Sequence, residues 1–177
     1  MFDIKRVTHK VIARLPTWTK TSLAITPKWP LELLAEQVFN QVFSEPLQQH
    51  EFAFLSDAVV VIVFEDIHLA MEVTLKESTS PALRVRLSTQ PQRFPDADVR
   101  LTGNFNHFIL MIAQRVDPDT LFFRRKLRIQ GDTELGLAVK NLLDTIDVQD
   151  QLPTPGYNLL NLLADQLEDF QAQATAS

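Results

Sequence analysis

The hydrophobic pattern in the middle of the chain is typical of β-strands. Apolar residues run without interruption through 59–64, which indicates a strand buried on both faces. Apolar and charged residues alternate through 83–87, which indicates a strand with one wet face. The connections after the early strands are short, so neighbouring strands are expected to be antiparallel. We predict strands over residues 51–55, 58–65, 68–75, 82–88, 98–101 and 127–130.

Apolar residues at three- and four-residue spacing predict helices that precede and follow these strands along the chain. The segment 31–43 carries one such stripe, which we expect to pack on the core. Its members are Leu31, Leu34, Ala35, Val38 and Val42. Residues 105–112, 134–146 and 157–170 show the same spacing, and Pro118 suits the first turn of a short helix.

The order of these elements predicts an α+β fold, with an antiparallel sheet and helices on one side of it. No internal repeat is evident in the sequence. Prolines near both ends divide the chain into three parts. We expect a basic amphipathic leader over 1–28, one globular domain over 29–150, and a C-terminal amphipathic helix and tail over 151–177.

The leader is basic although the whole chain has a net charge of −5. Its six Lys and Arg residues stand against Asp3 alone, and apolar residues recur at helical spacing from Ile4 to Leu15. We expect an interfacial helix that docks on anionic lipid headgroups. The docking residues would be Lys5, Arg6, Lys10 and Arg14. A helix packed on the chain's own core and an organellar transit peptide remain open as alternatives.

Composition excludes several classes of protein. The chain is 45% hydrophobic and 22% charged, which is the balance of an ordered globular protein. It has no cysteine, so we expect no disulfide, no thiolate nucleophile and no cysteine-held zinc or iron–sulfur cluster. The longest apolar run has seven residues, whereas a membrane-spanning helix needs about 20. Without a signal-peptide pattern, the expected compartment is the cytoplasm.

No group of residues predicts catalysis. The four histidines are scattered along the chain without metal-ligand spacing. Asp117 and Asp119 flank a proline and indicate a helix start, and the segment 131–136 indicates a helix cap, because its acidic side chains would repel a phosphate. His107 lies beside a phenylalanine-rich stripe, where it would be a structural residue or would meet a polar ligand group. We therefore expect no enzymatic activity, no metal and no cofactor.

Three segments carry a resemblance to a known family. They are DPDTLFFRR at 117–125, GDTELGL at 131–137 and VKNL at 139–142. The strand, glycine turn and small-residue helix resemble the sterol carrier protein type-two family. The longer string is similar to the ubiquinone-biosynthesis accessory factors within that family. The similarity is specific over 98–147 and looser over 30–97.

The resemblance implies a lipid tunnel between a curved sheet and its covering helices. The implied ligands are isoprenoid quinone intermediates or phospholipids. The implied role is an accessory one in the oxygen-independent bacterial route to ubiquinone, at the inner membrane. The iron–sulfur hydroxylation proteins UbiU and UbiV are the implied partners, and the absence of cysteine here fits such a division of labour.

Twelve phenylalanines against one tyrosine suit an apolar core or an apolar cavity better than a hydrogen-bonding pocket. Given the resemblance, we predict a set of lipid-binding residues from the apolar stripes of the later helices. They are Phe105, Phe108, Met111, Ile112, Leu121, Phe122, Leu135, Val139 and Leu142. Two alternatives stay open, namely a general carrier of fatty acids or phospholipids and a ligand-free scaffold for biosynthetic enzymes.

Overall fold

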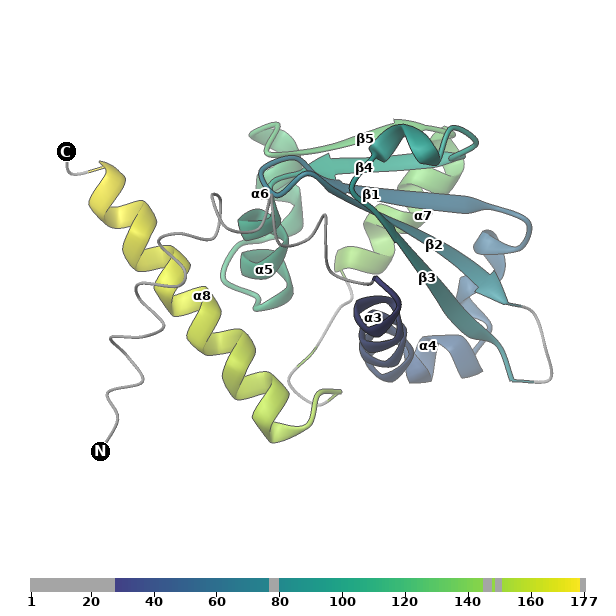
Figure 1. The fold of residues 1–177 in the computed structure, drawn as a ribbon, viewed down its shortest axis with the longest axis horizontal. Coiled ribbons are helices and arrows are strands. Elements are labelled where there is room, and N and C mark those ends of the chain that lie inside the picture. Colours follow the sequence, from purple (N-terminus) through teal and green to yellow (C-terminus); the bar gives the residue numbers. More distant parts are fainter. Residues whose placement is uncertain (1–27, 77–79, 145–147, 149–150, 176–177) are drawn as a thin grey trace.

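The computed structural model describes residues 28–76, 80–144, 148 and 151–175, and side-chain positions as far as residue 169. The chain forms a five-stranded sheet with helices gathered on one side of it (Figure 1). The elements, in chain order, are α3 (Trp29–Val42), α4 (Ser44–Gln48), η1 (Glu51–Leu55), β1 (Val59–Phe64), β2 (Leu69–Lys76), β3 (Ala82–Ser88), η2 (Pro91–Arg93), β4 (Val99–Gly103), α5 (Phe105–Ile112), α6 (Pro118–Phe123), β5 (Leu127–Gly131), α7 (Thr133–Asp144) and α8 (Thr154–Thr175).

The predicted α+β class is confirmed, and the sheet has the strand order β3-β2-β1-β4-β5. Three of its four pairings are antiparallel, as predicted. The fourth differs, because β1 and β4 run parallel and the sheet is therefore mixed. The segment between β3 and β4 crosses the sheet before β4 begins, which lets β4 enter beside the central strand in the same direction.

The predicted strand over 51–55 is wrong, because these residues form the 3-10 helix η1. Phe52 and Leu55 are its buried residues, and their three-residue spacing places both on one side of a 3-10 turn. His50 precedes η1 with a φ of 56°, in the left-handed region, so the chain reverses there instead of extending.

The two faces of the sheet pack differently. The inner face carries Val60, Val73 and Leu101, which join a single large apolar cluster with α5, α6 and α7. The outer face carries a small second cluster, in which Val61 and Ala70 pack with Phe94 from the β3–β4 connection. The uninterrupted apolar run of β1 is thereby explained, since the strand is covered on both faces.

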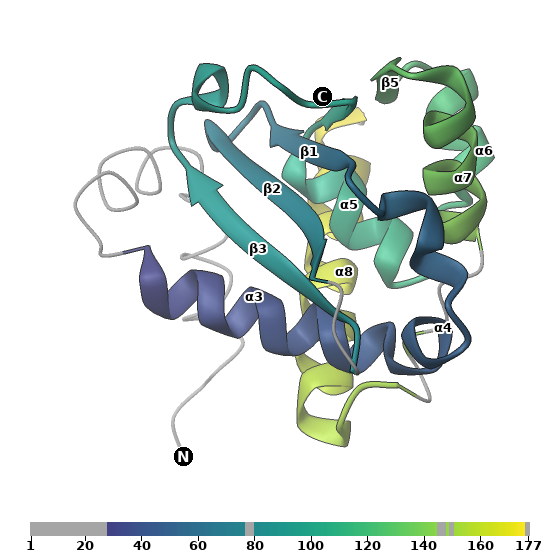
Figure 2. The ribbon, with the colours of Figure 1, turned by 90° about the vertical axis from the view of Figure 1, so that its right-hand side faces the viewer.

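Helix α3 lies along the edge strand β3 (Figure 2). Glu32 and Glu36 accept hydrogen bonds from the backbone N–H groups of Leu87 and Val85, at 2.7 and 3.0 Å. Asn40 both accepts from and donates to the backbone of Leu83, at 2.7 and 2.8 Å. Four helical residues advance about 6.0 Å and two strand residues about 6.6 Å, so the two repeats stay nearly in step. These side chains satisfy the open edge of the sheet.

This edge contact overturns part of the predicted stripe on α3. Ala35 and Val42 do pack against the inner cluster. Leu34 and Val38 instead face solvent, with 56% and 39% of their surface exposed. The polar residues that bind β3 fix the rotation of the helix, so that its apolar residues do not all reach the core.

Helix α8 packs across α5 and extends the predicted helix at both ends. Leu160 and Ala164 are its buried residues. The Arg115 guanidinium, just after α5, forms an ion pair with Asp165 at 2.7 Å. The C-terminal helix is therefore attached to the helical layer through α5 rather than to the sheet.

Candidate functional site

The nine predicted lipid-binding residues come together in one apolar layer between the sheet and helices α5, α6 and α7. Five of them are buried, namely Phe108, Met111, Leu121, Leu135 and Val139. The other four are partly buried and pack against the same cluster, namely Phe105, Ile112, Phe122 and Leu142. Neither of the two hollows described below includes any of the nine. Their role as a lipid lining stays a prediction.

Aromatic rings organise one end of this layer. Phe64, the last residue of β1, meets Phe105 and Phe108 of α5 edge to face, with ring centroids 5.5 and 5.1 Å apart. Such edge-to-face contacts add about 0.5–1.5 kcal/mol to the burial of each ring. The rings carry no hydrogen-bonding group, so this end of the layer suits hydrocarbon.

A second group of phenylalanines was missed in the sequence. Phe39, Phe43, Phe52 and Phe54 form a chain of ring contacts with centroid separations of 5.8, 5.3 and 5.9 Å. They join α3 to η1, and η1 was predicted as a strand, which hid their common location. Phe52 also borders a small hollow of about 240 Å³ beside Leu47 and Leu75.

Unsatisfied polar atoms lie at the start of α5, beside the aromatic end of the layer. The Asn106 Oδ1 and His107 Nδ1 atoms are buried and have no hydrogen-bond partner among the described residues. Burial lowers the pKa of His107, the nearby charge of Lys126 lowers it further, and Asp66 acts in the opposite direction. Since burial dominates, the neutral imidazole is favoured there. These atoms are suited to a polar group of a bound molecule.

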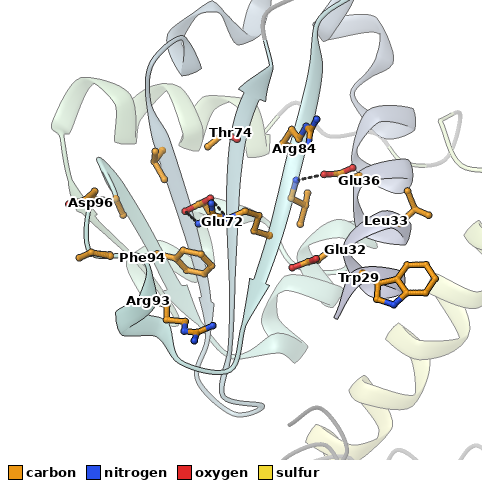
Figure 3. Close-up of a pocket in the computed structure, with 15 residues that line it drawn as sticks. Trp29, Glu32, Leu33, Glu36, Glu72, Thr74, Arg84, Arg93, Phe94 and Asp96 are labelled. Atoms are coloured by element: carbon orange, nitrogen blue, oxygen red, sulfur yellow. Dashed lines mark hydrogen bonds and ion pairs between the residues drawn. The ribbon is translucent and has the colours of Figure 1, made fainter. Parts of the chain in front are cut away.

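A larger hollow of about 800 Å³ lies on the outer face of the sheet, between α3 and the β3–β4 connection (Figure 3). Its floor holds Glu72 of β2 paired with Arg86 of β3 at 2.9 Å. The Arg86 guanidinium lies 5.6 Å from the centre of the Phe94 ring. The alternation of 83–87 predicted this wet face but not a hollow. Its charged floor makes it a poor container for a hydrocarbon chain.

The predicted membrane-docking residues Lys5, Arg6, Lys10 and Arg14 lie outside the described residues. No helix in the described ranges combines the length and apolar character needed to cross a membrane. Within those same ranges, no three His, Asp or Glu side chains gather as a metal site would require. The chemistry that the described part of the chain offers is therefore mainly apolar packing with a few polar atoms at its margin.

The layered fold and its enclosed apolar face define the class: the chain belongs to the SCP-2 sterol transfer family, whose profile matches residues 36–144. The expected resemblance to sterol carriers is thus confirmed. The chain is 31% identical over 167 residues to the "Ubiquinone biosynthesis accessory factor UbiT" of Escherichia coli (strain K12), an alignment that spans 94% of this chain and 88% of that protein. The solved structure of "UbiJ-SCP2 Ubiquinone synthesis protein" covers 67% of this chain and 93% of its own, with a TM-score of 0.51 and 16% identity. That structural likeness shows the fold alone.

Proposed function

We propose that this chain is a non-catalytic lipid-binding accessory factor in oxygen-independent ubiquinone biosynthesis in bacteria. It binds isoprenoid quinone intermediates, phospholipids or both, and presents them to hydroxylating enzymes. The observation that carries the proposal is the apolar layer of α5, α6 and α7, in a chain with 31% identity to UbiT. UbiU and UbiV are the proposed partners, and the proposed location is the cytoplasm, with peripheral contact at the inner membrane.

The physical reason for such a factor is the cost of a long apolar tail in water. Each buried CH₂ group gains about 0.8 kcal/mol relative to water, so a tail of many isoprene units does not leave a membrane unaided. A carrier that covers the tail lets a soluble enzyme reach the polar ring. Asn106 and His107 lie where α5 begins, beside Phe105 and Phe108, so the ring would lie at that end and the tail would extend along the layer.

The lining residues proposed for this site are the nine apolar residues of the layer, named above. Val139 offers a test, because a larger side chain has opposite effects in a lumen and in a solid core. In a lumen, Val139→Phe fills the space that a lipid uses, so lipid retention falls while the folded protein stays stable. In a solid core, the same change overpacks the structure and costs about 1–3 kcal/mol of stability without touching lipid retention.

Val61→Phe is the matched control, since Val61 is a fully buried valine on the outer face of the same sheet. It is expected to lower stability and to leave lipid retention unchanged. Equal lipid retention in the two variants, both folded by circular dichroism, would remove Val139 and its neighbours from the site.

The cellular part of the proposal is tested by ubiquinone content. A bacterial strain without this chain is expected to lose ubiquinone when grown without oxygen and to keep it when grown in air. Loss under both conditions, or under neither, would contradict an oxygen-independent role.

The leader over 1–28 is proposed to bring the protein to the membrane, with the domain over 29–150 binding lipid and the segment over 151–177 packing beside it. Deletion of residues 2–28 is expected to weaken binding to anionic vesicles. Unchanged binding after the deletion would refute a docking role for the leader.

A further inference from the structure

The turn between α6 and β5 exposes an aromatic ring among unpaired cations. Phe123, the last residue of α6, has 91% of its surface exposed, the highest value among the exposed large apolar side chains of the described residues. The three residues that follow it are all exposed and basic, namely Arg124, Arg125 and Lys126. None of the three forms an ion pair with another described residue, whereas Arg128, two positions further on, is paired with Glu65.

The backbone of this turn is well defined. The N–H groups of Arg124, Arg125 and Lys126 donate to carbonyls of α6 at 3.0, 2.9 and 2.8 Å, which closes the helix end. Leu121 before the turn and Leu127 after it are buried, so both ends of the turn are anchored in the core. The exposure of Phe123 therefore belongs to a fixed surface of the fold, which we call the basic turn (123–126).

We propose that the basic turn is a docking site for an anionic bilayer, in which the Phe123 ring enters the interface and the three cations bind lipid headgroups. Apolar rings beside unpaired Lys and Arg are the combination that anionic membrane surfaces favour. A protein partner is the weaker alternative, because a stable protein interface buries about 800 Å² on each side. Phe123 is the one strongly exposed large apolar residue of this turn. A bilayer deforms around such a protrusion.

The position of the basic turn links it to the apolar layer. Gly103, at the end of β4, lies between the basic turn and the apolar layer, which are in close contact there. A Cβ at this position would lie 2.8 Å from the Lys126 carbonyl oxygen and 3.3 Å from the Phe108 ring, so no side chain fits. β5, which follows the turn, is an edge strand of the sheet (Figure 1). Docking at this turn would thus bring the aromatic end of the layer, with Asn106 and His107, next to the headgroups. This consequence, lipid loading at that end, rests on the proposed function, whereas the docking itself does not.

The first experiment measures vesicle binding by the full chain. Vesicles of phosphatidylcholine, with and without phosphatidylglycerol, are sedimented with the protein. The triple variant Arg124→Gln, Arg125→Gly, Lys126→Gln is expected to bind the anionic vesicles about a hundredfold more weakly, since each cation near such a surface contributes roughly a factor of five. Arg125 has a φ of 56°, so glycine fits its backbone and the variant is expected to fold.

Phe123→Ser removes the exposed ring and is also expected to weaken binding to the anionic vesicles. The triple variant and Phe123→Ser each have a matched control. The triple variant Lys76→Gln, Arg84→Gln, Arg93→Gln removes three exposed cations elsewhere on the surface. Leu137→Ser removes another exposed apolar residue, on α7. Both are expected to change vesicle binding less than threefold. An equal loss in the charge control would mean that net charge alone drives binding, which overturns the proposal.

The second experiment separates the basic turn from the leader, which is also basic. The chain has no cysteine, so Phe123→Cys and Leu137→Cys each give one site for an environment-sensitive fluorophore. With anionic vesicles, the label at position 123 is expected to shift to shorter wavelength and the label at 137 to stay unchanged. Sedimentation with vesicles without a shift at position 123 would place the contact elsewhere and overturn the proposal. So would a shift produced only by an acidic protein partner. Lipids extracted from the same variants test the proposed function separately, because a chain can dock without retaining lipid.

Discussion

The two faces of the sheet are built from alternate residues of the same strands, yet they differ in how much apolar surface they bury. The inner face is continuous with an apolar layer under three helices, and its polar atoms lie at the margin. Within the described part of the chain, the outer face has only a small apolar cluster, under the β3–β4 connection, and beside it an open hollow with charged side chains on its floor. One sheet thus separates a face suited to hydrocarbon from a face suited to water, because successive side chains of a strand point to opposite sides.

The largest effect expected from this comparison is on stability. Phe64→Ala on the inner face removes a ring that contacts two other rings, and it should cost about 3–5 kcal/mol. Phe94→Ala on the outer face should cost less than Phe64→Ala, since its cluster has only three other buried members among the described residues. Denaturation in urea measures both. An equal or larger cost for Phe94→Ala would mean that the outer face carries the core.

The second-largest effect on stability is expected at the edge strand β3, where α3 binds the sheet. Asn40→Ala leaves both backbone groups of Leu83 without their partner on α3, and we expect a loss of about 2 kcal/mol. Gln41→Ala, an exposed neighbour on the same helix, is the control and should change stability little. If the two variants unfold at the same urea concentration, α3 does not hold the edge through this contact.

The polar margin of the inner face predicts a pH dependence. Because the pKa of His107 in the folded protein lies below its ordinary value of 6.5, the unfolded chain binds a proton more readily. Stability should therefore fall as the pH drops through 6.5 toward the folded pKa. His107→Gln should remove this part of the acid sensitivity. If the free energy of unfolding, measured in urea, depends on pH in the same way in wild type and His107→Gln, the predicted role of His107 is contradicted.

The smallest effect belongs to the outer face. Arg86→Ala breaks the ion pair with Glu72, but the Arg86 side chain is 66% exposed and solvent weakens the attraction. We expect a loss of about 0.5 kcal/mol, which shrinks further in high salt. A cost above about 2 kcal/mol in low salt would show that this pair is structurally central and that the outer face is not merely a wet surface.

Local patterns predicted most of the fold. The apolar run of β1, the alternation in β3 and the helix spacing of α5 and α7 are each confirmed, because each depends on which side of one element is covered. The parallel pairing of β1 with β4 was not predicted, since it depends on the path of the connection between β3 and β4. The strand predicted over 51–55 was wrong, because an apolar segment of five residues fits a 3-10 turn as well as a strand.

The candidate site was predictable only in part. Apolar spacing identified residues that gather in one layer, but spacing does not tell a lumen from a solid core, since both need apolar side chains. Leu34 and Val38 were predicted to face inward but are exposed. Helical spacing could not show this, because the hydrogen bonds that orient α3 join residues more than forty positions apart. The hollow on the outer face was not predicted for the same reason, because its walls come from α3 and the β3–β4 connection, which are far apart in the sequence.

The most direct test of lipid binding is mass spectrometry of the lipids that co-purify with the full chain from cells grown without oxygen. We expect prenylated phenols or quinone intermediates, with or without phospholipids, and a smaller amount in Val139→Phe than in Val61→Phe. A protein that carries no lipid, in wild type and in both variants, would contradict the account and favour a scaffold without a ligand.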